Sequence, residues 1–182
     1  MRELTFSPER ALESLLYLAI NLKNATIHEV LKLRYFADKI HLQRYGSIAS
    51  GDDYVAMKFG PVASNTYNMI KAARGERNGW IHPRFVEAVD GALSVPDGLH
   101  LKAMRGPNTN RLSAADLECL SEALRLYGNM PFDERTELSH DAAWKKAWDA
   151  AADESIKAGE MPIVEIASTL ENAKEVLEFL HE

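Results

Sequence analysis

The spacing of apolar residues predicts helices in the first quarter of the chain. Ser7 and Pro8 are typical of a helix start. The apolar positions after them follow the i, i+3, i+4, i+7 spacing of one buried helix face: Leu12, Leu15, Leu16 and Ala19. A second helix is predicted over Thr26–Tyr45, because Thr26 and Glu29 match a capping box and Gly46 suits a left-handed end.

Helical spacing returns in the last third of the chain. Four helices are expected there: Ser113 to Gly128, 133–138, one starting at Ser139 or His140, and one after a capping-box pattern at Ser168 and Glu171. Trp144 and Trp148 lie one helical turn apart and are expected in the core. The stretch Asp153–Met161 is predicted to be a loop.

The middle of the chain changes to the two-residue period of strands. Asp53–Phe59 alternates as a strand would, Gly60-Pro61 should break it, and a helix is expected from Pro61 to Ala73. Three further short strands are expected, two of them a hairpin around Asp90-Gly91: Arg84–Val89, Ala92–Val95 and Leu99–Lys102. The fold class is therefore mainly α (α+β): one helical domain over residues 1–182 with a small antiparallel sheet inserted in its middle.

Composition narrows the function classes. Acidic residues number 27 and basic residues 21, and the resulting net charge of −6 makes direct nucleic-acid binding an unfavoured role. The single cysteine, Cys119, cannot form an internal disulfide, which fits a reducing cytoplasm. Met1–Ser7 does not resemble a signal peptide, and the apolar stretch 11–22 is too short and too amphipathic to span a membrane. We therefore expect a cytoplasmic protein without a membrane partner.

A line of polar residues lies on one side of the second predicted helix. Arg34, Asp38, His41 and Tyr45 are spaced i, i+4, i+7 and i+11. Arg34 is expected to pair with Asp38, and Asp38 to accept a hydrogen bond from His41. Two interpretations stay open: a partly exposed structural network, or a contact face for a protein or a ligand.

Catalytic and metal chemistry find little support. Cys119 lies between Leu117 and Leu120 and is expected in or near the core, so no persuasive nucleophile accompanies Asp38 and His41. The metal-binding patterns His-Glu-x-x-His and Cys-x-x-Cys do not occur, and neither do the glycine-rich phosphate loops. Asp38, His41 and His140 could still meet in space and hold a metal.

Three motifs together resemble the SocA-like antitoxin family, also called the Panacea domain. The first is the helix Lys32–Leu42 with Tyr45-Gly46, followed by Ser50–Val62 and then Tyr67. Leu112–Leu124 is similar to the family's capped helix, and Leu138–Trp144 to its His and Trp element, although Ala143 stands where members often carry proline. The resemblance is strongest over residues 12–148.

The resemblance implies a non-enzymatic, phage-associated antitoxin of a toxin-antitoxin system, without a cofactor or catalytic residues. Members neutralise unrelated toxins, usually encoded beside them, by direct contact, and SocA itself resembles an adaptor that delivers its toxin to an AAA+ protease. The alternatives are such a proteolytic adaptor and a small metal-dependent enzyme using Asp38, His41 and His140. Expected partner-binding residues are Arg34, Asp38, His41, Tyr45 and Tyr67. Family-motif positions, which could equally be structural, are Asp52, Tyr54, Lys58, Gly60, Pro61, Val62, His140 and Trp144.

Overall fold

The computed structural model describes residues 5–76, 79, 81–151 and 158–181. Its helices are α1 Pro8–Asn21, α2 Ile27–Tyr45, α3 Ser64–Ala73, α4 Pro83–Val89, α5 Ala114–Tyr127, α6 Phe132–Ser139, α7 Ala142–Ala150, α8 Ile163–Ala167 and α9 Ala173–His181. Its strands are β1 Tyr54–Met57, β2 Gly60–Ala63, β3 Leu93–Ser94, β4 Lys102–Ala103 and β5 Gly159–Met161. The expected fold class, mainly α with a small antiparallel sheet, is confirmed.

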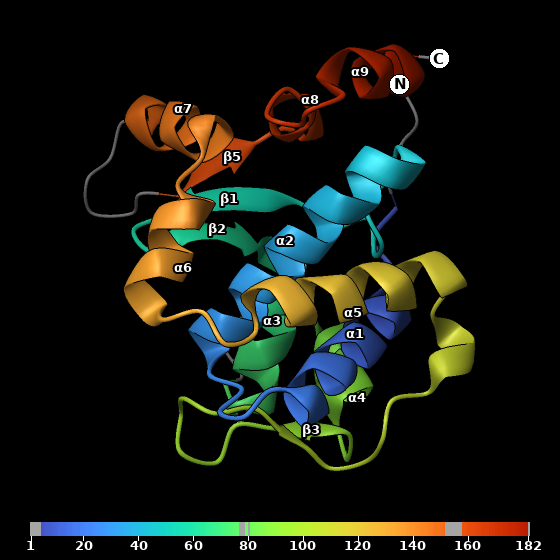
Figure 1. Cartoon of the computed structure of the whole chain (residues 1–182). Helices are drawn as coiled ribbons and strands as arrows, with labels where there is room; N and C mark the ends of the chain where they lie inside the picture. Colours follow the sequence, from blue (N-terminus) through green and yellow to red (C-terminus); the bar gives the residue numbers. More distant parts are fainter. Residues whose placement is uncertain (1–4, 77–78, 80, 152–157, 182) are drawn as a thin grey trace.

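Helix α2 is the centre of the fold. It packs against α1 and α5 on one side and against β2 and α6 on another, with α8 and α9 over its C-terminal half (Figure 1). Twelve of its side chains are buried, and they include charged residues as well as leucines. A helix covered on several sides has no solvated face, so its charged residues must find partners inside the protein.

The strand after α2 is one arm of a hairpin that the sequence did not reveal. β1 pairs with β2 from Tyr54↔Ala63 to Met57↔Gly60, and Lys58-Phe59 forms the turn. Gly60-Pro61 therefore starts a strand, and the prediction that a helix begins at Pro61 is wrong: α3 begins at Ser64. Proline is tolerated here because β2 is an edge strand, in a sheet of order β2-β1-β5.

The third strand of this sheet comes from far along the chain. β5 pairs with β1 through Tyr54↔Met161 and Ala56↔Gly159, so the prediction of a loop is wrong for 159–161. The preceding positions 153–157 lie outside the described residues. A Cβ on Gly159 would come within 2.0 Å of the Ala147 carbonyl oxygen, so only glycine lets β5 approach α7 this closely.

The hairpin predicted around Asp90-Gly91 is wrong. Residues 83–89 form helix α4, with Pro83 in its first turn and the His82 side chain accepting a hydrogen bond from the Arg84 N–H. The second small sheet joins β3 to β4 instead, with Leu93 opposite Ala103, so the strand predicted over Leu99–Lys102 overlaps it only at Lys102. A proline at the first helical position was the signal that outweighed the β-prone residues.

Several helix starts match their sequence signals and two do not. Ser7, Thr26 and Ser113 cap α1, α2 and α5 as predicted. Asp141, rather than Ser139 or His140, caps α7. Ser168 ends α8 and donates to the Glu165 carbonyl oxygen, so the capping box predicted there is wrong. In the part of the chain that is described, no helix has the length and apolar character needed to cross a membrane.

Candidate partner-binding site

Three of the five residues expected to contact a partner are buried. Arg34, Asp38 and His41 lie inside the molecule, whereas Tyr45 is 42% exposed. Tyr67 on α3 is half-buried, with the Lys71 ammonium 4.7 Å from its ring centroid. The aligned polar face of α2 is therefore an internal network rather than an exposed surface, and only its last position reaches solvent.

Arg34 and Asp38 pair as predicted, inside what we call the Asp38 cluster (Arg34, Asp38, Ser50 and Tyr54). The Arg34 Nε lies 3.5 Å from Asp38 Oδ2, and its Nη2 donates to Ser50 Oγ. Asp38 also accepts hydrogen bonds from the Tyr54 hydroxyl at 2.7 Å and the Ala49 N–H at 3.1 Å. Burial alone would lower the pKa of Arg34, but Asp38 and other acidic groups nearby raise it. The cluster ties α2 to the loop after it and to β1.

The predicted hydrogen bond from His41 to Asp38 is wrong, because His41 turns towards α5. Its Nδ1 lies 2.7 Å from the Ser47 carbonyl oxygen and its Nε2 lies 3.3 Å from Asp116 Oδ1. Asp116 also receives two hydrogen bonds from the Arg10 guanidinium, at 2.8 and 2.7 Å. Burial alone would raise the pKa of Asp116, but the contacts with His41, Arg10 and the Ser113 N–H hold it well below its ordinary value. This carboxylate joins α1, α2 and α5.

The motif residue Asp52 organises the start of α3. Its carboxylate accepts hydrogen bonds from the N–H groups of Asn65 and Thr66, at 2.9 and 2.8 Å, and from the Thr66 hydroxyl at 2.6 Å. These contacts satisfy N–H groups at the helix N-terminus that lack partners within the helix. The structure thus places Asp52, like the buried Tyr54, in the scaffold.

The Gly60-Pro61-Val62 motif forms the buried strand β2 against α2 and α6. Lys32 on α2 donates to the Pro61 carbonyl oxygen at 2.6 Å. Gly60 has φ +104°, and a Cβ there would lie 2.3 Å from Ser139 Oγ and 2.8 Å from Lys32 Cε. Only glycine allows this conformation and this contact with α6. The neighbouring Lys58, in contrast, is exposed at the hairpin turn.

His140 and Trp144 anchor the hairpin to α7. Their rings stack with centroids 3.6 Å apart, and the Trp144 Nε1 donates to the Met57 carbonyl oxygen at 2.9 Å. Trp148 stacks on Trp144 at 5.5 Å. Both tryptophans are half-buried, so the expectation of a core position is met only in part.

A second set of charged residues on α2, not singled out by the sequence, packs against α6. We call His28, Glu29, Lys32 and Arg135 the Arg135 cluster. The Arg135 Nη2 donates to the Met130 carbonyl oxygen at 2.6 Å, and its Nη1 lies 3.3 Å from Glu29 Oε1. Burial, and then the positive charge of Arg135, lowers the pKa of Lys32 to about 7. The sequence predicts a capping box in which the Glu29 side chain meets the Thr26 N–H, but only the Thr26 half forms, and the Glu29 carboxylate pairs with Arg135 on α6, a contact that no sequence pattern signalled.

Two large aromatic side chains lie exposed beside this cluster. Phe59 at the hairpin turn and Phe132 at the start of α6 are 52% and 47% exposed, and their ring centroids are 5.9 Å apart in an edge-to-face arrangement. Phe132 also lies 4.1 Å from the His28 ring. We refer to Phe59 and Phe132 as the aromatic pair. Aromatic side chains in contact with each other and with water are typical of protein-binding surfaces.

A cavity of about 410 Å³ opens between α2 and α6, next to the aromatic pair. Its walls come from two segments, one at the start of α2 and one that runs from the end of α5 into α6: Lys23, Asn24, Thr26, His28, Glu29, Gly128, Asn129, Met130, Pro131, Phe132 and Arg135. We call it the α6 pocket. Three members of the Arg135 cluster line this pocket and can be reached from solvent through it: His28, Glu29 and Arg135.

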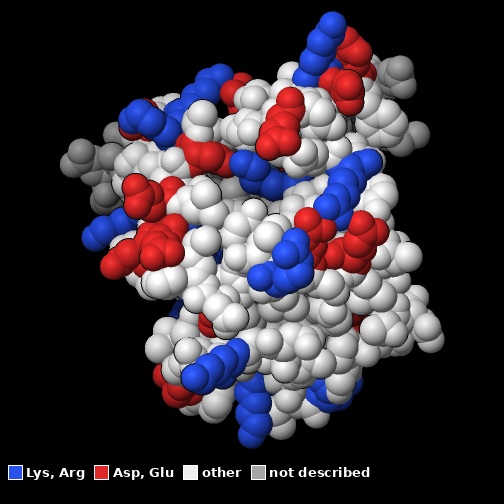
Figure 2. Space-filling view, viewed as in Figure 1, with Lys and Arg blue, Asp and Glu red and all other residues white. Residues whose placement is uncertain are grey.

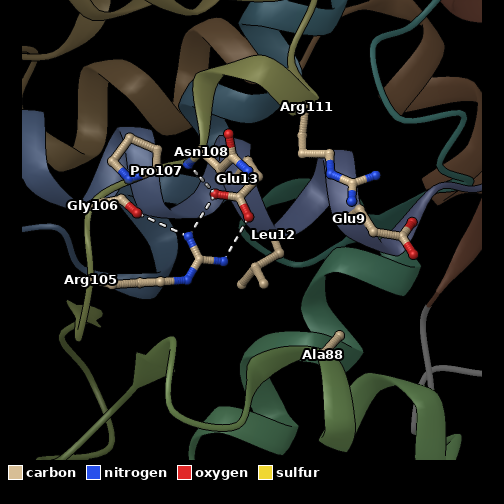
Figure 3. A pocket seen from close by; sticks show the side chains of 9 residues that line it. All are labelled: Glu9, Leu12, Glu13, Ala88, Arg105, Gly106, Pro107, Asn108 and Arg111. Carbon is tan, nitrogen blue, oxygen red and sulfur yellow. Dashed lines mark hydrogen bonds and ion pairs between the residues drawn. The ribbon is translucent and has the colours of Figure 1, made fainter.

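A larger cavity of about 650 Å³ lies between α1, α4 and the loop before α5 (Figure 3). Its central carboxylate, Glu13, faces the Arg105 guanidinium with two contacts of 2.9 and 2.6 Å. Glu13 also accepts a hydrogen bond from the Asn108 N–H at 2.6 Å. These contacts fasten the loop 105–108 to α1, so the charged centre of this cavity is already occupied by its own partners.

Within the described residues, the candidate metal ligands do not gather into a metal site. Cys119 is buried, as expected, and burial raises the pKa of its thiol to about 12. Among the described residues, no group of three or more His, Cys, Asp and Glu side chains could hold a metal ion. Asp38, His41 and His140 each have the separate partners described above.

Figure 2 shows Lys and Arg side chains interspersed with Asp and Glu over the face it presents.

Comparisons with known proteins give a family. No curated protein and no solved structure matches this chain. The family model for the SocA-like antitoxin, Panacea domain, matches residues 30–145. The match runs from the first turn of α2 into α7 and covers the Asp38 cluster, the hairpin, α6 and, of the Arg135 cluster, Lys32 and Arg135. Because it spans more than half of the sequence, the chain belongs to the SocA-like antitoxin, Panacea domain family.

Proposed function

We propose that this protein is an antitoxin that neutralises a partner toxin by binding it directly and covering its working surface. The observation that carries this proposal is the family membership, since the family is one of antitoxins. The fold adds a rigid platform, because the hairpin and α6 are both fixed to the central helix by buried contacts. A rigid platform lowers the entropy cost of forming a complex.

We propose the aromatic pair as the centre of the contact surface. Exposed aromatic residues are enriched among the few side chains that carry most binding energy, and Phe59 and Phe132 support each other's position. A stable interface buries about 800 Å² on each partner, so neighbouring residues would take part. Tyr45 and Tyr67 stay predictions as partner contacts because both are at least partly exposed, but Tyr45 lies at the opposite end of α2 from His28, which contacts Phe132.

The test is co-expression with the product of an adjacent gene, the usual place of the toxin in this family, followed by a pull-down. We expect restored growth and a stoichiometric complex. Phe59→Ser should weaken the affinity by roughly 30-fold, as for a residue at the centre of an interface. Met104→Ser is the matched control, because Met104 is 55% exposed but lies beside β4, away from the hairpin.

The outcomes separate the mechanisms. A stable complex with the toxin still present supports neutralisation by covering. Rescue in which the toxin disappears, and returns when an AAA+ protease is deleted, would favour a proteolytic adaptor instead. If neither rescue nor binding is seen with the toxin of this locus, the antitoxin proposal fails. Equal losses in Phe59→Ser and Met104→Ser would contradict the proposed surface alone.

A further inference from the structure

The Arg135 side chain is held in the α6 pocket with part of its hydrogen-bonding capacity unused. The side chain is only 7% exposed, and its Nη2 is satisfied by the Met130 carbonyl oxygen. Nε and Nη1 have no hydrogen bond to any described residue, although Nη1 forms an ion pair with Glu29. The His28 Nδ1 is also buried without a well-formed hydrogen bond to a described residue, although the Phe59 backbone nearby partly offsets the lowering of the His28 pKa. Arg34 also has Nε and Nη1 without hydrogen bonds to described residues, but Arg34 is fully buried, whereas Arg135 lines a pocket through which another molecule can reach it.

The charges around the pocket are unequal. Arg135 faces Glu29, the one carboxylate among the residues that line the pocket, while Lys32 lies outside that lining, has a pKa lowered to about 7 and donates to a carbonyl oxygen. Burial lowers the pKa of His28 to about 4, assisted by Lys32 and Arg135, so His28 is neutral near pH 7 and neither adds to the positive charge nor offsets it. Lys23 lines the pocket rim. In a protein of net charge −6, this is a local excess of positive charge that suits an anion.

The pocket and the aromatic pair share one side chain. Phe132 is a wall of the α6 pocket and also the partner of Phe59. A segment that covers the aromatic pair therefore reaches the wall of the pocket that Arg135 also lines. A carboxylate that enters from such a segment would be shielded from water by the two rings, and a charge-assisted hydrogen bond is stronger there than on an open surface.

We propose that the α6 pocket receives an Asp or Glu side chain of the partner protein, next to an apolar residue of the partner that rests on the aromatic pair. This inference rests on the proposed function, because it assigns the chemistry of the partner at that surface. The carboxylate completes the contacts of Arg135 and offsets the positive charge of the Arg135 cluster. Recognition then depends on one acidic and one apolar side chain in close succession.

The first test needs no toxin. The probe is the short peptide acetyl-Glu-Phe-amide, titrated into the ¹⁵N-labelled full chain, with acetyl-Gln-Phe-amide as the uncharged match. We expect the Glu peptide to shift the NMR signals of Arg135 Nε and of His28, and to bind at least ten-fold more tightly than the Gln peptide. Equal binding of the two peptides, or tighter binding of inorganic phosphate than of the Glu peptide, would overturn the proposal.

Two substitutions should change the preference for the Glu peptide over the Gln peptide in opposite directions, which a purely structural role of these residues would not produce. Arg135→Gln should abolish the preference for the Glu peptide. Glu29→Gln should strengthen it, because removal of the competing carboxylate leaves Arg135 free. Glu134→Gln, an exposed position on the same helix, is the control and should leave binding unchanged. If Arg135→Gln does not fold, a weaker or unchanged preference in Glu29→Gln still overturns the proposal.

The second test uses the toxin complex and separates this inference from the proposed function. Arg135→Gln should lower the affinity for the toxin at least ten-fold and reduce its dependence on salt. Rescue and binding that survive Arg135→Gln unchanged would contradict the inference and leave the antitoxin role intact. Binding of the Glu peptide without any neutralisation of the toxin would instead count against the proposed function.

Discussion

Two charged clusters touch the central helix α2, and they differ in how their charges are balanced. In the Asp38 cluster, Arg34 lies against a carboxylate that also accepts hydrogen bonds from Tyr54 and Ala49. In the Arg135 cluster, Arg135 pairs with Glu29 beside the α6 pocket, while Lys32 has a carbonyl oxygen rather than a carboxylate as its partner. The first cluster is closed in the sense that Arg34 is fully buried and lines no pocket, although its Nε and Nη1 also lack hydrogen bonds to described residues, and it holds the scaffold together. The second is open and has capacity for a further anion, which is why we place partner recognition there.

The largest effect is expected from breaking the closed cluster. Asp38→Ala removes the acceptor of three buried donors and leaves the Arg34 guanidinium without its partner. Loss of one member of a buried pair costs about 3–5 kcal/mol, so the free energy of unfolding should fall by that amount. Urea denaturation measures it. Asp53→Ala, at an exposed position on the same loop, should change stability by less than about 0.5 kcal/mol. Wild-type stability in Asp38→Ala would remove the distinction between the clusters.

The open cluster should instead cost stability near neutral pH. The pKa of Lys32 in the folded protein, about 7, is below its ordinary value of 10.5, because burial and Arg135 disfavour the charged form. Between these two pH values the unfolded chain binds more protons than the folded protein, so the free energy of unfolding rises with pH. Below about pH 7, Lys32 is charged in both states and the destabilisation caused by burying its charge is fully present. We expect a rise of roughly 2 kcal/mol between about pH 7 and pH 9.

Lys32→Met should remove this rise. Denaturation of both proteins across that pH range gives the difference directly, and other groups that titrate there cancel in the comparison. A matched change at the exposed Lys58, Lys58→Met, should leave the pH dependence as in the wild type. Parallel curves for wild type and Lys32→Met would show that the Arg135 cluster is as well compensated as the Asp38 cluster.

Helix α2 also shows which features can be predicted from the sequence and which cannot. Its ends follow from Thr26 and Gly46, whose capping roles depend only on neighbouring backbone, and the structure confirms both. The exposure of its side chains depends on what α1, α5, α6 and the hairpin bring to it, so Arg34 and Asp38 could be paired from spacing but not placed inside the protein. Arg135 was missed for the same reason. Its partner Glu29 lies more than a hundred positions away, and only the fold joins them.

The dependence of stability on acid pH tests a second enclosed carboxylate, that of Asp116. Its pKa in the folded protein is held well below the ordinary 3.8 because the contacts with His41, Arg10 and the Ser113 N–H outweigh burial. Such a group stabilises the fold above its unfolded pKa and loses that contribution as pH falls below about 4. We expect Asp116→Asn to lower stability at neutral pH by about 1–2 kcal/mol and to flatten the loss of stability in acid. An acid-unfolding curve identical to that of the wild type would contradict this assignment.

The smallest effect is expected where α2 leaves the interior. Near its last turn, Arg44 pairs with Glu118 at 2.7 Å, but both side chains are more than one-third exposed. Water screens such a pair, so a double-mutant cycle of Arg44→Ala and Glu118→Ala should give a coupling energy of less than about 0.5 kcal/mol. The same helix thus carries ion pairs of very different strength, and burial rather than distance sets the order. If the exposed pair coupled as strongly as Arg34 and Asp38, burial would not set the strength of these ion pairs. The charge balance of buried clusters could then not be used to tell a scaffold cluster from a recognition site.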